Sequence, residues 1–243
     1  MLYYRTLGIV LKSQNHQEAD RVYTVYTEKY GKIKLLVKGA RKIKSKLAGH
    51  LEPFNLVDLT AVKGKIWDKI INVFTVKSFS HLKRNFRKII YGSYILEIID
   101  NLIKEHHQDK EVFKLLKKTL DNLQIAKQSF LQIIDYFIFR LLCLLGYEPN
   151  LSSCVFCKKR TTLSKNKSIS ISWKFGGLVC NQCKKLDQNS LIISEESVWK
   201  IKEILAENLI PENHDQSLTK IINSFLKYHL EKELKSEKLI FEL

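Results

Sequence analysis

The first 80 residues alternate between short apolar runs and polar turns. Five of the runs are rich in β-branched and aromatic residues and therefore predict strands. These strands are expected at 3–12, 21–27, 33–37, 54–62 and 70–79. Five short strands without a convincing helix indicate a small barrel. The OB-fold is the five-stranded candidate, and an SH3-like barrel or a small sandwich is the alternative.

Helical periodicity begins near residue 81, where apolar residues start to recur every three or four positions. It predicts helices at 86–104, about 112–120, 130–145, 195–207 and 217–234. Gly146 follows the third helix as a C-cap residue. The expected fold is therefore α+β and multi-domain. Residues 1–81 form the barrel, and residues 82–243 form a helical domain interrupted at about 150–188 by a cysteine-bearing insert.

The apolar segment 133–145 is the richest in the chain, and Asp135 and Arg140 interrupt it. No run approaches 18 apolar residues, so no membrane span is expected. The N-terminus lacks a basic segment followed by an apolar one, so no signal peptide is expected. Five cysteines without such a signal indicate reduced thiols in a cytoplasmic protein. Cys143, within a predicted helix, is expected to be a buried structural thiol.

Net charge suggests a polyanionic partner, because the chain carries +16 at pH 7. Residues 1–81 contribute +9 (15 basic, 6 acidic), and residues 82–194 contribute +10 (19 basic, 9 acidic). Residues 195–243 contribute −3 (7 basic, 10 acidic). A polyanion is therefore expected to bind the first two-thirds of the chain.

One basic segment, Lys38–Lys46, concentrates this charge. It contains five cations, and no acid lies between Glu28 and Glu52. A run of like charges is tolerated on a solvated surface or against an anionic partner, and both readings remain open on charge alone. The predicted nucleic-acid contacts combine this segment with two strand cations: Arg21, Lys34, Lys38, Arg41, Lys42, Lys44 and Lys46.

Aromatic side chains near this segment are candidates for stacking on bases. Tyr23, Tyr26 and Tyr30 come first, with Phe54 and Trp67 behind them. Barrel core is the alternative reading for each. Because alternate residues of a strand face opposite ways, Tyr23 and Tyr26 are expected on opposite faces and cannot both stack on bases.

Two CxxC pairs, 22 residues apart, contain Cys154, Cys157, Cys180 and Cys183. Two such knuckles present four thiolates tetrahedrally and leave no open coordination position. The separation is slightly long, and a hairpin with one strand at Ile169–Trp173 accommodates the extra residues. We predict one structural Zn²⁺, with a dithiol redox role or free thiols as alternatives.

The cysteine-bearing insert carries eight cations and no acid between Cys154 and Lys185, so with a four-thiolate zinc its charge is about +6. These cations provide either a second phosphate-binding surface or solubility. No P-loop and no glycine-rich dinucleotide motif is present, which disfavours an NTPase. No paired-carboxylate cluster indicates a two-metal nuclease, so a metal-dependent nuclease is only a remote alternative.

Several motifs match those of one protein family in their order and spacing along the chain. They are Glu18–Arg21, Thr27–Lys32, Lys38–Leu47, Leu51–Phe54, the two CxxC pairs with Gly176 and Gly177, Phe225–Leu230 and Leu234–Ser236. Together they resemble the RecO family of bacterial recombination mediators in its zinc-finger form. The resemblance is weakest over about 100–140 and after Leu191.

The resemblance implies an OB-fold, a helical domain and an inserted zinc finger. It also implies binding of single- and double-stranded DNA, annealing of complementary strands, and action with RecR in loading RecA onto strands coated by single-strand-binding protein, whose acidic tail would bind the helical domain. It implies no catalytic residue and a nucleoid-associated, cytoplasmic protein of the RecF pathway. An RNA-binding translation or ribosome-associated factor is the alternative from another class.

Overall fold

The computed structural model describes residues 3–128, 130–161, 169–207, 210, 214–230 and 232–241. The chain forms two compact units. The first combines residues 1–126 with 232–243, and the second contains residues 127–231. The first unit thus holds the barrel, the helices that directly follow it and the C-terminal segment. The domain bounds expected at residues 81 and 82 remain a prediction.

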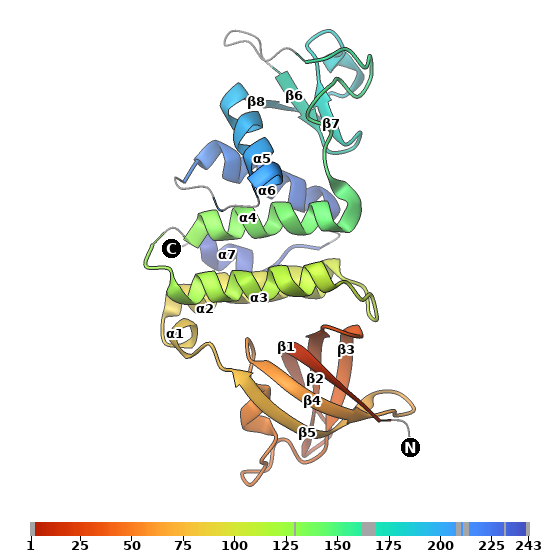
Figure 1. Cartoon of the computed structure of the whole chain (residues 1–243), viewed down its shortest axis with the longest axis vertical. Coiled ribbons are helices and arrows are strands. Elements are labelled where there is room, and N and C mark those ends of the chain that lie inside the picture. The colour runs from red at the N-terminus through yellow and green to blue at the C-terminus, as the bar shows by residue number, and fades with distance from the viewer. Residues whose placement is uncertain are drawn as a thin grey trace. The chain divides into compact units, whose positions relative to one another are not determined.

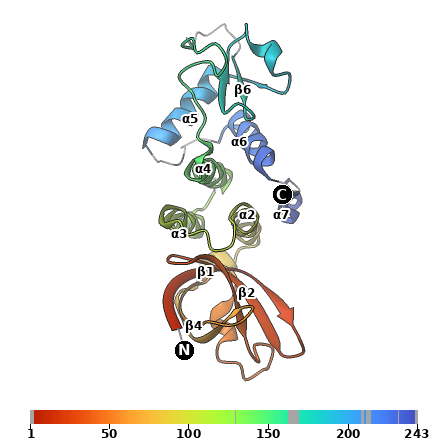
Figure 2. The same ribbon diagram turned by 90° about the vertical axis from the view of Figure 1, so that its right-hand side faces the viewer.

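Five strands close into a barrel in the first unit (Figures 1 and 2). Their bounds are β1 Tyr3–His16, β2 Asp20–Thr27, β3 Gly31–Val37, β4 Leu56–Val62 and β5 Asp68–Lys77. The order around the barrel is β1-β2-β3-β5-β4, with β3 and β5 parallel and the other pairs antiparallel. The predicted OB-like barrel is confirmed.

The barrel core consists of the inward-facing residues of all five strands, including Leu35, Val57 and Leu59. Tyr23 belongs to this core and is 1% exposed. Tyr26 points outward, yet it is fully buried because its ring packs 6.3 Å from that of Phe113. The expectation of opposite faces is confirmed. The expectation that either ring is available to bases is wrong, because packing buries both.

Among the residues described, four α-helices and one 3-10 helix complete the first unit: η1 Ala48–Leu51, α1 Ser80–Lys83, α2 Phe86–Leu102, α3 Lys110–Ile125 and α7 Lys235–Phe241. Side chains cap α2 and α3, since Asn85 accepts from the Lys88 amide and Asp109 from two amides of the first turn of α3. The Tyr26 hydroxyl donates to the Asp109 carbonyl at 3.2 Å and so ties the barrel to α3. An ion pair between Lys12 of β1 and Asp100 of α2 joins the second helix to the barrel, and α2 and α3 lie against one side of it (Figure 2).

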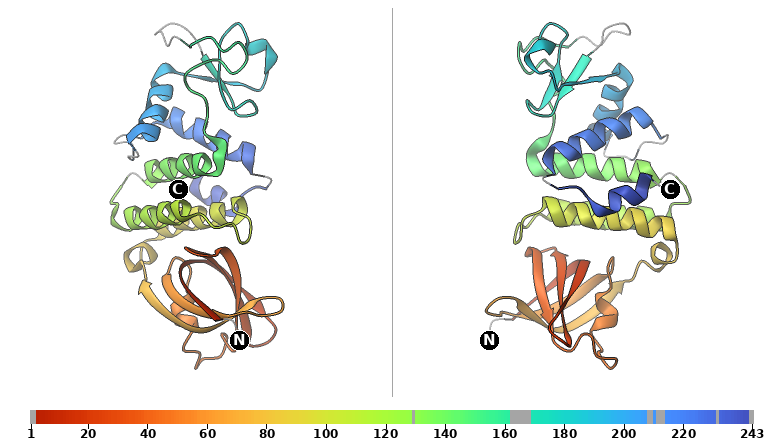
Figure 3. Two further views of the ribbon diagram at one scale, coloured as in Figure 1. Left: turned by 45° about the vertical axis from the view of Figure 1, so that its right-hand side comes forward. Right: turned by 180° about the vertical axis from the view of Figure 1, so that it is seen from behind.

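The second unit is built on α4 Phe130–Leu142, α5 Glu195–Glu207 and α6 Gln216–His229. A π-helical turn, η2 Cys143–Tyr147, extends α4 and contains Gly146, whose φ of 90° favours glycine. α4 and α6 lie side by side (Figure 3), with the Phe139 and Phe225 rings 6.0 Å apart. This interface forms the apolar centre of the unit.

The helix predicted over 217–234 is interrupted. α6 ends at His229, Leu230 is extended, and α7 begins at Lys235. The chain passes from the second unit to the first within this gap. Leu234 is buried, and the Glu97 carboxylate accepts hydrogen bonds from the amides of Lys235 and Ser236. These contacts with the first unit stabilise the break more than a continued helix would.

The segment Phe130–Tyr147 bears on the expectation that no membrane span is present. It is a helix long and apolar enough, by length and composition, to cross a membrane, with a mean hydropathy of 1.6. Its two interrupting charges do not lower the average enough to exclude a span. In the structure 56% of the segment is buried, and α4 packs against α5 and α6. Its apolar character is therefore accounted for by its place in the core.

Asp135 of α4 is an unusual member of that core. Burial raises the pKa of Asp135 to about 7, and the hydroxyl of Thr219, 2.5 Å from its Oδ2 atom, only partly opposes the shift. An acid with a raised pKa binds more protons in the folded than in the unfolded chain. The free energy of unfolding therefore falls as the pH rises from about 4 to 7, by up to about 4 kcal/mol.

Replacing Asp135 with Asn should remove this loss, so the variant should be more stable than the parent at pH 8 and about equal to it at pH 4. Urea unfolding in a Trp67→Phe background measures this, since Trp173 and Trp199 then report on the second unit. Glu203→Gln, which changes an exposed acid of α5, serves as the control. Equal pH dependence in parent and Asp135→Asn proteins would contradict the assignment.

Candidate nucleic-acid interface and metal centre

The basic segment follows β3 directly and is pinned to the barrel at its start. Gly39 has a φ of 67°, and its amide donates to Asp20 Oδ1 at 2.7 Å. Two further turns follow, because the amides of Lys42 and Ser45 donate to the carbonyls of Gly39 and Lys42. Gly39 thus shapes the loop, as a residue tolerant of positive φ is expected to do.

Arg41 is engaged in holding the loop. Its amide donates to the Ala19 carbonyl at 2.9 Å, and its Nη1 atom donates to the Glu18 carbonyl at 2.9 Å. A longer contact of 3.3 Å joins Nη1 to the Gln17 carbonyl. The guanidinium therefore links the basic loop to the β1–β2 turn while its side chain stays exposed. Its cationic charge remains available to a ligand, but part of its donor capacity is occupied.

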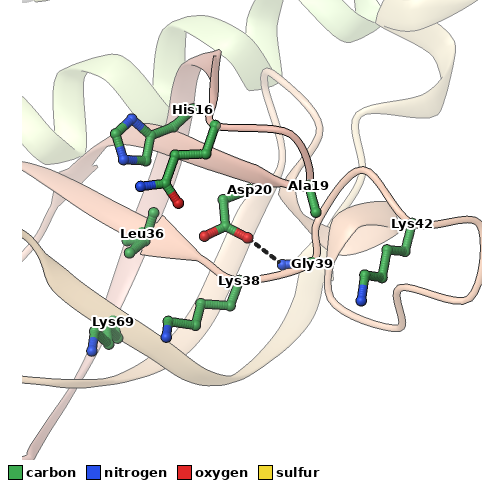
Figure 4. A pocket seen from close by; sticks show the side chains of 9 residues that line it. His16, Ala19, Asp20, Leu36, Lys38, Gly39, Lys42 and Lys69 are labelled. Atoms are coloured by element: carbon green, nitrogen blue, oxygen red, sulfur yellow. Dashed lines mark hydrogen bonds between the residues drawn. The ribbon is translucent and has the colours of Figure 1, made fainter.

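An open cavity of about 490 Å³ lies between the basic loop and the β1–β2 turn (Figure 4). Its lining consists of His16, Gln17, Ala19, Asp20, Leu36, Lys38, Gly39, Lys42 and Lys69. Three lysines supply positive charge from the loop and from β5. The single carboxylate, that of Asp20, accepts from the Gly39 amide. The lining is thus predominantly cationic and suits an anion such as a phosphate.

Of the predicted nucleic-acid contacts, all except Lys34 lie in the basic loop or on β2. Lys38 and Lys42 line the cavity, while Lys44 and Lys46 are exposed in the same loop. Arg21 lies on β2 and its Nε atom donates to Asn15 Oδ1 at 3.2 Å.

Lys34 lies apart from this group, because it forms a 2.5 Å ion pair with Glu105. Asp100 of α2 similarly pairs with Lys12 and Lys32. Carboxylates that follow or end α2 therefore neutralise this flank of the barrel, and Lys34 is the predicted contact least free to meet a phosphate.

Lys69 and His16 are among the cavity residues that the sequence did not predict. Lys69 enters the cavity because the parallel pairing of β3 and β5 places it opposite Leu36. His16 contributes its ring, which packs edge-on at 4.9 Å against Trp67. Nothing in the local pattern signals a parallel contact between strands more than 30 residues apart in sequence.

The other stacking candidates differ in exposure. Phe54 is 6% exposed and belongs to the buried set, so a stacking role for it is wrong. Tyr30 is 36% exposed and packs at 4.5 Å on Tyr4, while Trp67 is half-buried beside the cavity. Of the five candidates, Tyr30 and Trp67 keep a surface for a base.

In the second unit, the four predicted cysteines come together. Their Sγ atoms all lie within 4.8 Å of one another, and those of Cys157 and Cys180 are 3.8 Å apart. A tetrahedral zinc with Zn–S bonds of about 2.3 Å requires sulfur separations of about 3.8 Å. The donor set and its spacing thus fit a four-thiolate metal ion. Cys143 is half-buried and lies outside the cluster.

Backbone amides favour the thiolate form of Cys154, which is the form that a metal requires. Burial alone would raise the pKa of Cys154, but amide donors from Cys180, Cys157 and Phe156 outweigh it and lower the pKa to about 6. One of these donors, the Cys180 amide, lies 3.5 Å from Cys154 Sγ.

A small three-stranded sheet supports the cysteine cluster. Its strands are β6 Ile169–Ser172, β7 Gly177–Val179 and β8 Leu191–Ile193, in the order β7-β6-β8. The hairpin expected between the knuckles is confirmed as the antiparallel pair of β6 and β7, whereas the three-residue β8 was not anticipated. The first knuckle packs onto β7, since the Val155 amide donates to the Leu178 carbonyl at 2.9 Å. Of the eight cations, Lys165 and Lys167 lie outside the described residues.

Fold and site together define a class: a basic OB-like barrel joined to a helical part that carries a four-cysteine cluster. Two family models cover almost all of the chain. "Recombination protein O N terminal" matches residues 1–79, and "Recombination protein O C terminal" matches residues 83–238. The chain belongs to the RecO family.

Curated relatives of the same family align with nearly the whole length of this chain. "DNA repair protein RecO" of Thermoanaerobacter sp. (strain X514) is 30% identical and aligns over 98% of this chain and 97% of its own. The protein of the same name from Dehalococcoides mccartyi is also 30% identical, over 96% and 93%. That of Alkaliphilus metalliredigens is 28% identical, over 94% of each chain.

Proposed function

We propose that this protein is a recombination mediator that binds single- and double-stranded DNA without reading sequence and anneals complementary strands. With RecR, it would help to load RecA onto strands coated by single-strand-binding protein. The observation that carries this proposal is the exposed basic loop beside a cationic cavity, on an OB-like barrel of a RecO-family chain. In OB-folds the β1–β2 loop is a general nucleic-acid-binding position, and Arg41 ties the basic loop of this barrel to that turn.

The mechanism is electrostatic. Lys42, Lys44 and Lys46, with Lys38 and Lys69 at the cavity, would neutralise phosphates and release condensed counterions. Phosphate contacts position a strand but carry no sequence information. Tyr30 and Trp67 would add stacking, which tolerates any base. Two strands held in this way lose much of their mutual repulsion, which favours pairing between them.

The proposal assigns no catalytic residue, because strand binding and pairing require no covalent step. A Zn²⁺ bound by Cys154, Cys157, Cys180 and Cys183 would be structural, since four thiolates leave no open coordination position. We further propose a cytoplasmic, nucleoid-associated location. The tail of single-strand-binding protein would bind the helical part.

Competition between single-stranded DNA and RNA of matched length and sequence tests this function against the alternative of an RNA-binding translation factor. The proposal predicts that DNA of unrelated sequences competes equally well, and at least as well as RNA. A strong preference for RNA would support the alternative instead. Labelled DNA incubated with Mg²⁺ should remain intact, because cleavage would indicate a nuclease.

A further inference from the structure

The cysteine-bearing insert presents two aromatic rings at its surface. Phe156 lies within the first knuckle, between the two cysteines, and Phe175 lies in the turn between β6 and β7. Their ring centroids are 4.7 Å apart with an interplanar angle of 59°. Phe175 is 43% exposed. Two chain segments distant in sequence thus build one aromatic pair, in which Phe156 is half-buried and Phe175 is exposed.

The pair is held in place by the backbone beneath it. The Phe175 amide donates to the Ser172 hydroxyl at 3.2 Å, which orders the turn. Val155, next to Phe156, donates its amide to β7. The rings are therefore positioned before any ligand arrives, which lowers the entropy cost of binding.

The rings do not form the core of the insert. Ile171, Leu178 and Val179 are fully buried and fill that role. The hairpin is anchored to α6 separately, because the Trp173 indole donates to the Ser224 hydroxyl at 2.8 Å and stacks at 4.2 Å on Phe225. Truncating Phe175 should therefore leave the fold of the insert intact.

Cations lie close to the pair in space or in sequence. The Lys174 Nζ atom lies 5.3 Å from the centroid of the Phe175 ring, and Lys158, Lys159 and Arg160 follow the first knuckle directly. Among the residues that the structure describes, no carboxylate pairs with Lys159, Arg160 or Lys174. The sequence from Cys154 to Lys185 contains no acid. The charge complements a polyanion, and the exposed ring suits the face of a base.

We propose that Phe156 and Phe175, with the cations around them, form a second DNA-binding surface that is selective for single strands. A base would stack on the exposed face of Phe175, and neighbouring phosphates would contact Lys174 and the cations after the knuckle. Bases in a duplex are already stacked, so they cannot use the ring. The ligand class follows from the proposed function, and the surface is additional to the barrel loop.

The test uses the full-length, zinc-loaded chain with Arg41, Lys42, Lys44 and Lys46 changed to Ala, so that the barrel loop contributes least. Added to this parent, Phe175→Ala should lower affinity for fluorescent single-stranded DNA about tenfold and leave duplex affinity unchanged. Phe175→Trp should restore the parent's affinity. Trp199→Ala is the matched control, because Trp199 is 52% exposed, belongs to the same unit and lies under the Lys202 ammonium.

Three outcomes separate the possibilities. Unchanged single-strand affinity in the Phe175→Ala protein overturns the second surface while leaving the proposed function intact. An equal loss on single strands and duplex also overturns it, since stacking would then not be the cause. Absence of DNA binding by the wild-type chain at low salt overturns the proposed function, and with it this surface.

Discussion

Changing Arg41, Lys42, Lys44 and Lys46 together to Ala should lower affinity for single-stranded DNA by roughly 100- to 1,000-fold at moderate salt. Each lost phosphate contact removes about 0.7 from the slope of log affinity against log salt, so four contacts remove about 3. The reduction should be the same for unrelated sequences, because phosphate contacts carry no sequence information. Fluorescence anisotropy over a salt series measures both quantities.

The control removes the same charge from another face of the first unit. Lys104, Lys110, Lys114 and Lys117 are exposed on or just before α3, and their replacement by Ala should cost far less affinity. Equal losses in the two quadruple variants would show that net charge, not the loop, governs binding. An unchanged affinity and salt slope in the loop variant would show that the loop is not the site.

Arg41 deserves a separate comparison, because its guanidinium also holds the β1–β2 turn. A triple variant that keeps Arg41 and changes Lys42, Lys44 and Lys46 should lose about 2 from the salt slope. If Arg41→Ala alone lowers the affinity for single-stranded DNA more than any single lysine change does, the additional loss is due to the loss of loop anchoring.

The second large effect concerns the cysteine cluster. Changing Cys154 to Ser should reduce bound zinc from one ion per chain to none, as measured by elemental analysis. Zinc binding to small structural sites supplies folding free energy of about 10–16 kcal/mol, so the knuckles should lose their structure. Emission from Trp173 should shift to longer wavelength in a protein whose Trp67 and Trp199 are changed to Phe.

Cys143→Ser provides the matched control, because this thiol lies outside the cluster. It should keep one zinc and normal Trp173 emission. Retention of a full zinc equivalent by the Cys154→Ser protein would contradict the four-thiolate site. Loss of zinc without any change at Trp173 would show that the metal does not support the hairpin.

Much of this architecture could be predicted from the sequence, because it depends on local pattern. Runs rich in β-branched and aromatic residues, bounded by polar turns, predicted the barrel strands. The paired CxxC motifs identified the cysteine cluster, because two residues between ligands already suit a knuckle turn. Gly146 and Gly39 could be assigned to a helix end and a loop turn, where positive φ favours glycine.

The remaining features depend on contacts distant in sequence. The parallel pairing of β3 and β5 brings Lys69 into the cavity, and no local pattern reports it. Lys34 meets Glu105 only because α2 ends beside the barrel. The strand pattern alone leaves Tyr26 available at the barrel surface, whereas in the structure Phe113 of α3 covers its ring. The end of α6 at His229 is likewise set by the passage of the chain between units.

The central claim is most directly tested by the annealing of complementary oligonucleotides that are each coated with single-strand-binding protein. The wild-type chain should accelerate annealing of unrelated sequences alike, and added salt or the quadruple change in the basic loop should suppress the acceleration. A folded, zinc-loaded wild-type chain that leaves the annealing rate at its uncatalysed value would contradict the account.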